Sequence, residues 1–178
     1  MYAEAARRIG SALARSGLGL VYGGGRVGLM GTVADAVLAE GGRVIGVIPD
    51  PLATTEVAHY GLTELYIVPG MHERKALMAQ KSAGFLTLPG GVGTFEEFFE
   101  IWSWAALGLH HKPIGLLNVE GYFDPLLALI DHAAAERFLR PEYLELLVVS
   151  DRPEALAADL LTHTPPPIGP KRIDLDET

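Results

Sequence analysis

The chain has 178 residues, of which 49% are hydrophobic and 20% charged, enough for one domain with a substantial core. Its formal net charge of −8 argues against nucleic acid and anionic membranes as partners, and the absence of cysteine excludes disulfides, thiolate catalysis and Cys-based metal sites. No apolar run approaches the roughly 18 residues of a membrane span, and residues 1–10 lack the apolar core of a signal peptide. We therefore expect a cytoplasmic protein.

Short apolar runs alternate with amphipathic segments along the chain, the pattern of a parallel sheet covered by helices. A helix is predicted over residues 2–15, with Ala5, Ile9, Ala12 and Leu13 on one face. Strands are predicted at residues 18–22, 43–48, 64–68, 84–88, 113–117 and 146–149. Further helices are predicted at residues 29–40, 72–82, 94–107, 122–135 and 153–161.

This order predicts an α/β fold, a Rossmann-like doubly wound parallel sheet with helices on both faces. We expect a single nucleotide-binding domain over residues 1–163, followed by a proline-rich and then charged tail over residues 164–178. A doubly wound domain normally opens on a strand, often a central one. This chain opens on a helix, so either the usual first strand lies upstream of a mis-set start or the sheet manages without it.

The segment 21–31, VYGGGRVGLMG, follows a predicted strand and opens a helix. It contains G-x-G-x-x-G at Gly23, Gly25 and Gly28, and Asp50 ends the next predicted strand about 20 residues later, the spacing of a dinucleotide fingerprint. The alternative is a tight turn in which the glycines only permit close helix–strand packing. The fingerprint usually follows the first strand of the fold, whereas a helix precedes this one. An NAD-dependent oxidoreductase is therefore retained only as an alternative.

The segment 88–97, LPGGVGTFEE, is the more specific signal. A predicted strand runs into a turn with glycines at 90, 91 and 93, and the turn runs into a helix whose first N–H groups favour a phosphate. In the alternative interpretation, Thr94 and Glu97 form a capping box that satisfies backbone N–H groups. Capping explains those two residues but not the glycines before them. We therefore predict a phosphate cradle, with Glu96 and Glu97 beside it.

The segment 71–75, MHERK, opens another predicted helix. Arg74 and Lys75 stand near the N-terminal end of that helix, where the dipole disfavours cations. A basic pair is often only a solvated face. In an acidic protein, however, this placement indicates an anion to be held, and the fork of Arg74 suits a phosphate or a carboxylate.

The helix after the glycine turn is apolar on more than one side, which predicts burial in the core and at a dimer interface. The residues concerned are Phe95, Phe98, Phe99, Ile101, Trp102, Trp104, Ala105 and Leu109. The six histidines show no spacing typical of metal ligands, so no metal site is predicted.

Taken together, these motifs resemble the LOG ("lonely guy") family of cytokinin riboside 5′-monophosphate phosphoribohydrolases and its bacterial AMP-cleaving relatives. The matching stretches are VYGGGRVGLMG, GGRVIGVIP, MHERK, LPGGVGTFEE and KPIGLLNVEGYFDPLL, in family order over residues 2 to 160. The combination of MHERK with PGGVGTFEE is the most specific. The family has also been labelled lysine decarboxylase, but no lysine here stands in a pyridoxal-phosphate context.

The resemblance implies a homodimer that cleaves the N-glycosidic bond of an N6-modified AMP, or of AMP itself, without a cofactor. It implies that Arg74 and Glu97 are the catalytic pair. The residues that it implies for the 5′-phosphate are Gly90, Gly91, Val92, Gly93 and Thr94. The remaining substrate contacts that it implies are Glu56, Lys75, Phe95, Glu96 and Ser103, the last of which stands where the family often has threonine.

Two departures from the family pattern affect the nucleotide site. The family's first strand and its Gly-Ser turn are absent, and Ala53-Thr54-Thr55 stands where a proline–arginine pair is common before Glu56. A non-catalytic carrier, like the molybdenum-cofactor carriers of similar fold, is the other alternative. A carrier needs the phosphate cradle but not an acid, so the pairing of Arg74 with Glu97 argues for the enzyme.

Overall fold

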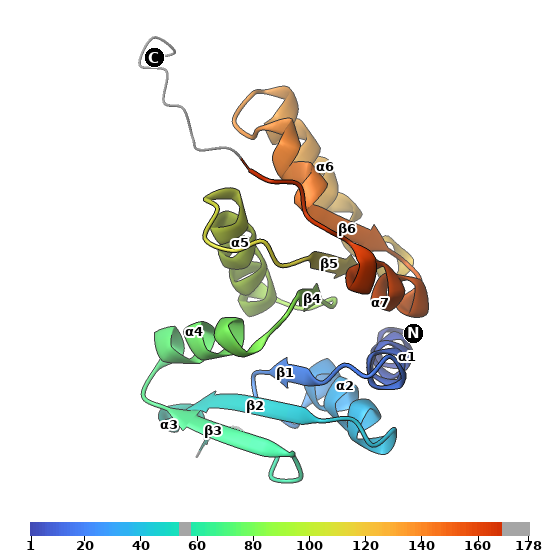
Figure 1. The fold of residues 1–178 in the computed structure, drawn as a ribbon, viewed down its shortest axis with the longest axis vertical. Helices are drawn as coiled ribbons and strands as arrows, with labels where there is room; N and C mark the ends of the chain where they lie inside the picture. Colours follow the sequence, from blue (N-terminus) through green and yellow to red (C-terminus); the bar gives the residue numbers. More distant parts are fainter. Residues whose placement is uncertain (54–57, 169–178) are drawn as a thin grey trace.

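The computed structural model describes residues 1–53 and 58–168, which form an α/β fold with parallel strands (Figure 1). One three-stranded sheet has the order β1-β2-β3, with β1 at Leu20–Tyr22, β2 at Val44–Pro49 and β3 at Glu64–Val68. The other has the order β4-β5-β6, with β4 at Phe85–Thr87, β5 at Ile114–Leu117 and β6 at Leu147–Ser150. All four strand pairings are parallel, so the predicted fold class is confirmed.

Helices connect the strands, and the predicted ones all occur with ends shifted by a few residues. Their bounds are α1 Tyr2–Arg15, α2 Gly28–Ala39, α4 Met71–Lys81, α5 Val92–Ala106, α6 Asp124–Ala135 and α7 Pro153–Thr162. The short elements α3 (Asp50–Ala53), η1 (Val119–Gly121) and η2 (Pro141–Leu146) were not predicted. Within 1–53 and 58–168, none of the helices has the length and apolar character needed to cross a membrane.

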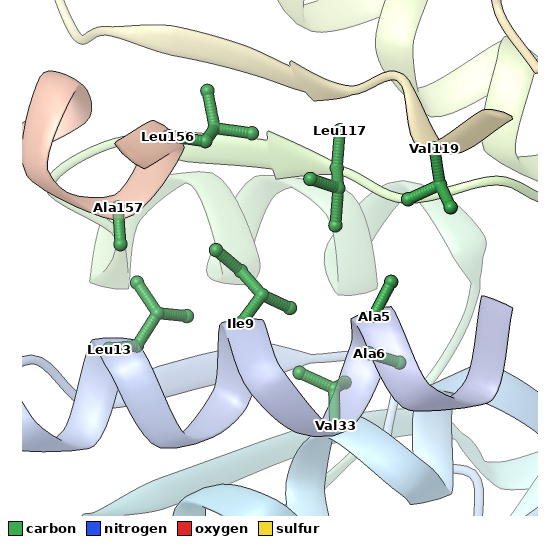
Figure 2. Close-up of a cluster of buried hydrophobic side chains, with 9 residues drawn as sticks. All are labelled: Ala5, Ala6, Ile9, Leu13, Val33, Leu117, Val119, Leu156 and Ala157. Carbon is green, nitrogen blue, oxygen red and sulfur yellow. The ribbon is translucent and has the colours of Figure 1, made fainter. Parts of the chain in front are cut away.

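The first core layer joins the two ends of the chain (Figure 2). The buried stripe of α1 faces α2, α7 and β5, and Figure 2 shows Ile9 rising toward Leu117 and Leu156. At Gly10, an added Cβ would stand 2.7 Å from the carbonyl oxygen of Val33, so only glycine lets α1 and α2 approach this closely. The amphipathic pattern of residues 2–15 therefore predicted this layer correctly.

The second core layer covers the opposite face of β5. Ile114 and Leu116 point into it while Leu117 points into the first layer, as the two-residue period of a strand requires. Phe98 and Trp102 of α5 and Phe123 before α6 fill this layer. Helices thus cover both faces of this sheet, as predicted.

The parallel strands are divided between β1 and β4. Each of these strands pairs on one side only in the described chain, β1 with β2 and β4 with β5. Between them lies a cavity of about 870 Å³, whose apolar lining includes Leu20 and Leu86. The Tyr22 hydroxyl is buried there without a hydrogen-bond partner among the described residues, and burial raises its pKa. The described strands therefore form two three-stranded halves with this cavity between them.

The described chain continues beyond α7. After α7 ends at Thr162, residues 163–168 continue without helix or strand, and Ile168 packs against the second core layer. Residues 169–178 lie outside the described residues. The division into a domain over residues 1–163 and a tail over 164–178 stays a prediction.

Candidate active site

The candidate site lies where β1 and β4 end. The turn after Tyr22 meets Arg74 at Gly23, and Arg74 faces Glu97 in the helix that follows β4, so the carboxyl ends of these two strands lie together, the usual location of ligand sites in open α/β folds. The cavity between the half-sheets extends to this edge, where Arg74, Thr94 and Glu97 line it. Two of the predicted motifs, MHERK and PGGVGT, are therefore brought together around one cavity.

The glycine turn leads into a helix whose first N–H groups have no side-chain cap in the described chain. The N-cap of α5 is Gly91, and no side chain of the described residues caps this end; the N–H groups of Thr94 and Phe95 donate to the Gly91 carbonyl oxygen at 3.0 and 3.2 Å. Thr94 stands two residues inside the helix, so the capping-box interpretation of Thr94 and Glu97 is wrong. The helix begins earlier than that pattern implied because glycine itself serves as the N-cap.

Space around this turn is distributed unevenly. A Cβ at Gly90 would overlap the Thr94 hydroxyl, whereas a Cβ at Gly91 or Gly93 would meet no atom of the described chain within 4 Å. Val92 is 84% exposed. Packing therefore requires glycine at position 90, while the backbone from 91 to 93 borders open space and can be approached by an anion.

Arg74 of α4 faces Glu97 of α5 across the cavity. Their Nη1 and Oε1 atoms are 3.8 Å apart, and the side chains are 12% and 36% exposed respectively. Nη1 also donates to the sulfur of Met71 at 3.6 Å, while the buried Nε has no hydrogen-bond partner among the described residues. A buried guanidinium with unused donors is unusual in a folded protein. Arg74 can therefore bind an additional acceptor.

Burial dominates the electrostatics of Glu97. Desolvation raises the pKa of its carboxyl group, the positive charge of Arg74 opposes that rise, and the negative charge of Glu96 adds to it. A raised pKa beside a cavity is expected of a carboxyl group that exchanges protons or stabilises positive charge.

Lys75 forms a network with α5. Its Nζ donates to Glu96 at 2.6 Å and to Glu100 at 3.0 Å, and its side chain is only 11% exposed. These hydrogen bonds raise the pKa of Lys75. Glu100 was not predicted, although its position four residues after Glu96 on the same helix face would have indicated it.

The other predicted residues are placed differently. Phe95 packs against the second core layer. Ser103 is exposed on α5 and does not line the cavity formed by the described residues. Glu56 lies outside the described residues. Sequence reasoning missed Tyr122, whose hydroxyl reaches the glycine turn from 32 residues away.

Two glycines of segment 21–31 lie in close contacts within the chain. A side chain at Gly23 would overlap the guanidinium of Arg74, and Gly24 has φ +75° where it packs against Ile48. Asp50 begins α3 and is exposed. The contact at Gly23 favours the tight-turn interpretation for that position, whereas a Cβ at Gly28, which has φ +70°, would meet no atom of the described chain within 4 Å.

Comparison with known proteins places this geometry in a family. The family model described as "Possible lysine decarboxylase" matches residues 30–160. A cytokinin riboside 5′-monophosphate phosphoribohydrolase of Rhodococcoides fascians is 55% identical over 159 residues, covering 88% of this chain and 80% of that protein. A probable cytokinin riboside 5′-monophosphate phosphoribohydrolase of Oryza sativa subsp. japonica is 47% identical over 164 residues, covering 92% and 74%.

Solved structures agree on the fold. The molybdenum cofactor carrier protein of Chlamydomonas reinhardtii has a TM-score of 0.66 at 22% identity, covering 91% of this chain and 89% of that one. The molybdenum cofactor binding protein of Rippkaea orientalis has a TM-score of 0.67 at 20% identity, covering 90% and 88%. At such identity the likeness shows the fold alone. The sequence matches decide the family: this chain belongs to the LOG family, whose model is described as "Possible lysine decarboxylase" and whose relatives are named cytokinin riboside 5′-monophosphate phosphoribohydrolases.

Proposed function

We propose that this protein is a phosphoribohydrolase. It hydrolyses the N-glycosidic bond of a purine nucleoside 5′-monophosphate, an N6-modified cytokinin nucleotide or AMP, to the free base and ribose 5-phosphate. The observation that carries the proposal is the juxtaposition of Arg74 and Glu97, 3.8 Å apart, at a cavity beside the uncapped start of α5. The 55% identity to a phosphoribohydrolase supports it.

The 5′-phosphate binds at the glycine turn in this proposal. The turn from Gly90 to Thr94 presents the backbone N–H groups that precede Thr94 and the positive end of the α5 dipole, and the exposed backbone at Gly91 and Gly93 lets a phosphate approach. Holding the phosphate fixes the distance between the ribose and Glu97. Binding energy away from the scissile bond thereby supports the reaction at C1′.

Glu97 acts at the sugar. When the bond from C1′ to the purine nitrogen breaks, positive charge develops on the ribose, and an ionised carboxylate beside it stabilises that charge. The same carboxylate orients the water and accepts its proton as the hydroxyl group adds to C1′. The departing purine nitrogen takes up one proton, so one water is consumed for each bond broken. The raised pKa of Glu97 suits this role as a base.

Arg74 contributes its unused donors. Its guanidinium holds a phosphate or ribose oxygen and helps the purine to leave, which gives a partner to the buried Nε. Lys75, Phe95, Glu96, Ser103 and Glu56 are proposed as further substrate contacts. Lys75 acts partly by holding Glu96.

The proposal includes a cytoplasmic homodimer. Large apolar side chains on and after α5 remain exposed in the single chain, among them Phe99 at 39%, Leu107 at 64% and Leu109 at 70%. A second copy of the chain would remove such surface from water.

One experiment separates the possible functions. The purified protein is incubated with AMP and with isopentenyl-AMP, and the products are separated by chromatography. We expect free adenine or isopentenyladenine, with one ribose 5-phosphate for each base. Intact nucleotide recovered from a protein that binds it would overturn the hydrolase and favour the carrier, whose fold this chain shares. In a parallel incubation with NADH, a fall in the NADH absorbance would favour the oxidoreductase instead.

A further inference from the structure

Tyr122 connects the glycine turn to the opposite part of the fold. Its hydroxyl donates a hydrogen bond to the carbonyl oxygen of Gly90 at 2.6 Å, and the tyrosine itself lies between η1 and α6. A Cβ added at Gly90 would overlap the Thr94 hydroxyl. The peptide that precedes the N-cap of α5 is therefore held by a side chain from another element.

The loop that carries Tyr122 is firmly fixed. The Asn118 side chain accepts a hydrogen bond from the Phe123 N–H at 2.7 Å and donates to Asp124 at 2.8 Å. The Asn118 N–H donates to the carbonyl oxygen of Ser150 at 2.8 Å, and the ring of Phe123 is completely buried. The Tyr122 ring packs edge-on against Tyr2, with centroids 5.8 Å apart. The Tyr122 hydroxyl is thus a fixed point to which the turn is attached.

The geometry of the peptide bond gives this attachment a consequence. In a planar trans peptide the C=O and N–H groups point in opposite directions. A Gly90 carbonyl directed at Tyr122 therefore directs the Gly91 N–H away from Tyr122. Two successive glycines leave such a peptide free to rotate, and an added Cβ at Gly91 would meet no atom of the described chain within 4 Å. Packing at Gly91 does not select an orientation, but the tyrosine hydroxyl does.

We propose that Tyr122 is a positioning residue that locks the Gly90–Gly91 peptide with the Gly91 N–H toward the 5′-phosphate. The inference rests on the proposed function, because it assigns the phosphate to this turn. Without the hydroxyl, the peptide samples orientations in which the N–H faces elsewhere, and each binding event must restore the correct one. The loss falls on phosphate affinity, since Arg74 and Glu97 are not touched.

The test is Tyr122→Phe, with Tyr2→Phe as the matched control. Tyr2 belongs to the same ring pair, and its hydroxyl has no hydrogen bond within the described residues. Titration calorimetry measures the Kd of ribose 5-phosphate and of inorganic phosphate. For Tyr122→Phe we expect both Kd values to rise about 3- to 10-fold, the effect of one neutral hydrogen bond. The KM for AMP should rise by a similar factor, with kcat preserved within about twofold. Tyr2→Phe should leave all values unchanged.

The outcomes separate this inference from the proposed function. Equal Kd values for Tyr122→Phe and the unaltered protein would overturn the inference, whatever the protein hydrolyses. If the unaltered protein binds ribose 5-phosphate but leaves AMP intact, the proposed function fails and the Kd comparison still decides the role of Tyr122. If the unaltered protein binds neither phosphate ligand, the inference is overturned, and release of free base from AMP still decides the proposed function. Partial misfolding lowers the calorimetric stoichiometry rather than changing the Kd, so the comparison remains valid for a less stable variant.

Discussion

The guanidinium of Arg74 lies against the backbone of Gly23, in the space that a side chain at position 23 would fill. Gly23 follows β1 and Arg74 belongs to α4, so the first glycine motif and the MHERK motif form one structure. This contact gives Gly23 a function that needs no dinucleotide. It also makes the position of Arg74, and its 3.8 Å approach to Glu97, depend on the absence of a Cβ.

Gly23→Ala is therefore expected to displace the guanidinium while leaving the fold intact. The overlap is with the flexible end of an arginine, so the melting temperature should change little. A displacement of about 1 Å at a catalytic group can reduce turnover about 100-fold, and we expect kcat for AMP to fall 10- to 100-fold by this mechanism. Arg74→Lys provides the control in a double-mutant cycle. If Gly23→Ala costs as much in the Arg74→Lys background as alone, it does not act through Arg74.

Glu97→Gln should remove turnover and retain binding. The amide keeps the size of the side chain but carries no negative charge, so kcat is expected to fall by about 100-fold or more, while the Kd of ribose 5-phosphate changes little. Stability should not fall at neutral pH. A carboxyl whose folded pKa is raised favours the folded state below its unfolded pKa, and this contribution is lost as the pH rises through the folded pKa. Undiminished hydrolysis would remove Glu97 from the mechanism.

The pH profile reports the ionisation of Glu97. Activity requires the carboxylate, so kcat/KM should decline on the acidic side, starting at a higher pH than an ordinary glutamate would produce. Glu96→Gln removes a negative charge that raises the pKa of Glu97, and it should move the acidic limb to lower pH. The measurement is kcat/KM against pH at constant ionic strength. An unchanged limb in Glu96→Gln would mean that another group controls it.

Local sequence patterns predicted the helices, the strands and the MHERK and PGGVGT motifs, but not the contacts between them. The period of Ala5, Ile9 and Leu13 was sufficient for α1, because an amphipathic stripe has one way to be buried. The capping-box error arose because Thr94 and Glu97 have the required spacing although Gly91 ends the turn. Sequence spacing alone does not distinguish a helix that has Thr94 as its N-cap from one that has Gly91.

The contacts that build the site were beyond such patterns. Those of Gly23 with Arg74 and of Tyr122 with Gly90 join residues 51 and 32 positions apart, and each depends on how separate elements pack. The division of the sheet between β1 and β4 is likewise a matter of strand pairing. Hydrophobic periodicity shows that a segment is a strand, but it does not name the neighbours of that strand.

Lys75→Met should lower stability and also change the pH profile. The shift of the acidic limb should be opposite in direction to that of Glu96→Gln. Removing the ammonium leaves Glu96 and Glu100 without their shared cation, at a cost of about 1 to 2 kcal/mol in the free energy of unfolding after allowance for solvent screening. The charge of Lys75 also lowers the pKa of Glu97, so its loss should shift the acidic limb of kcat/KM to higher pH. Lys81→Met is the matched control, because Lys81 lies on the same helix but contacts Tyr66 instead. Equal shifts in the two variants would show that Lys75 acts only through the general charge of α4.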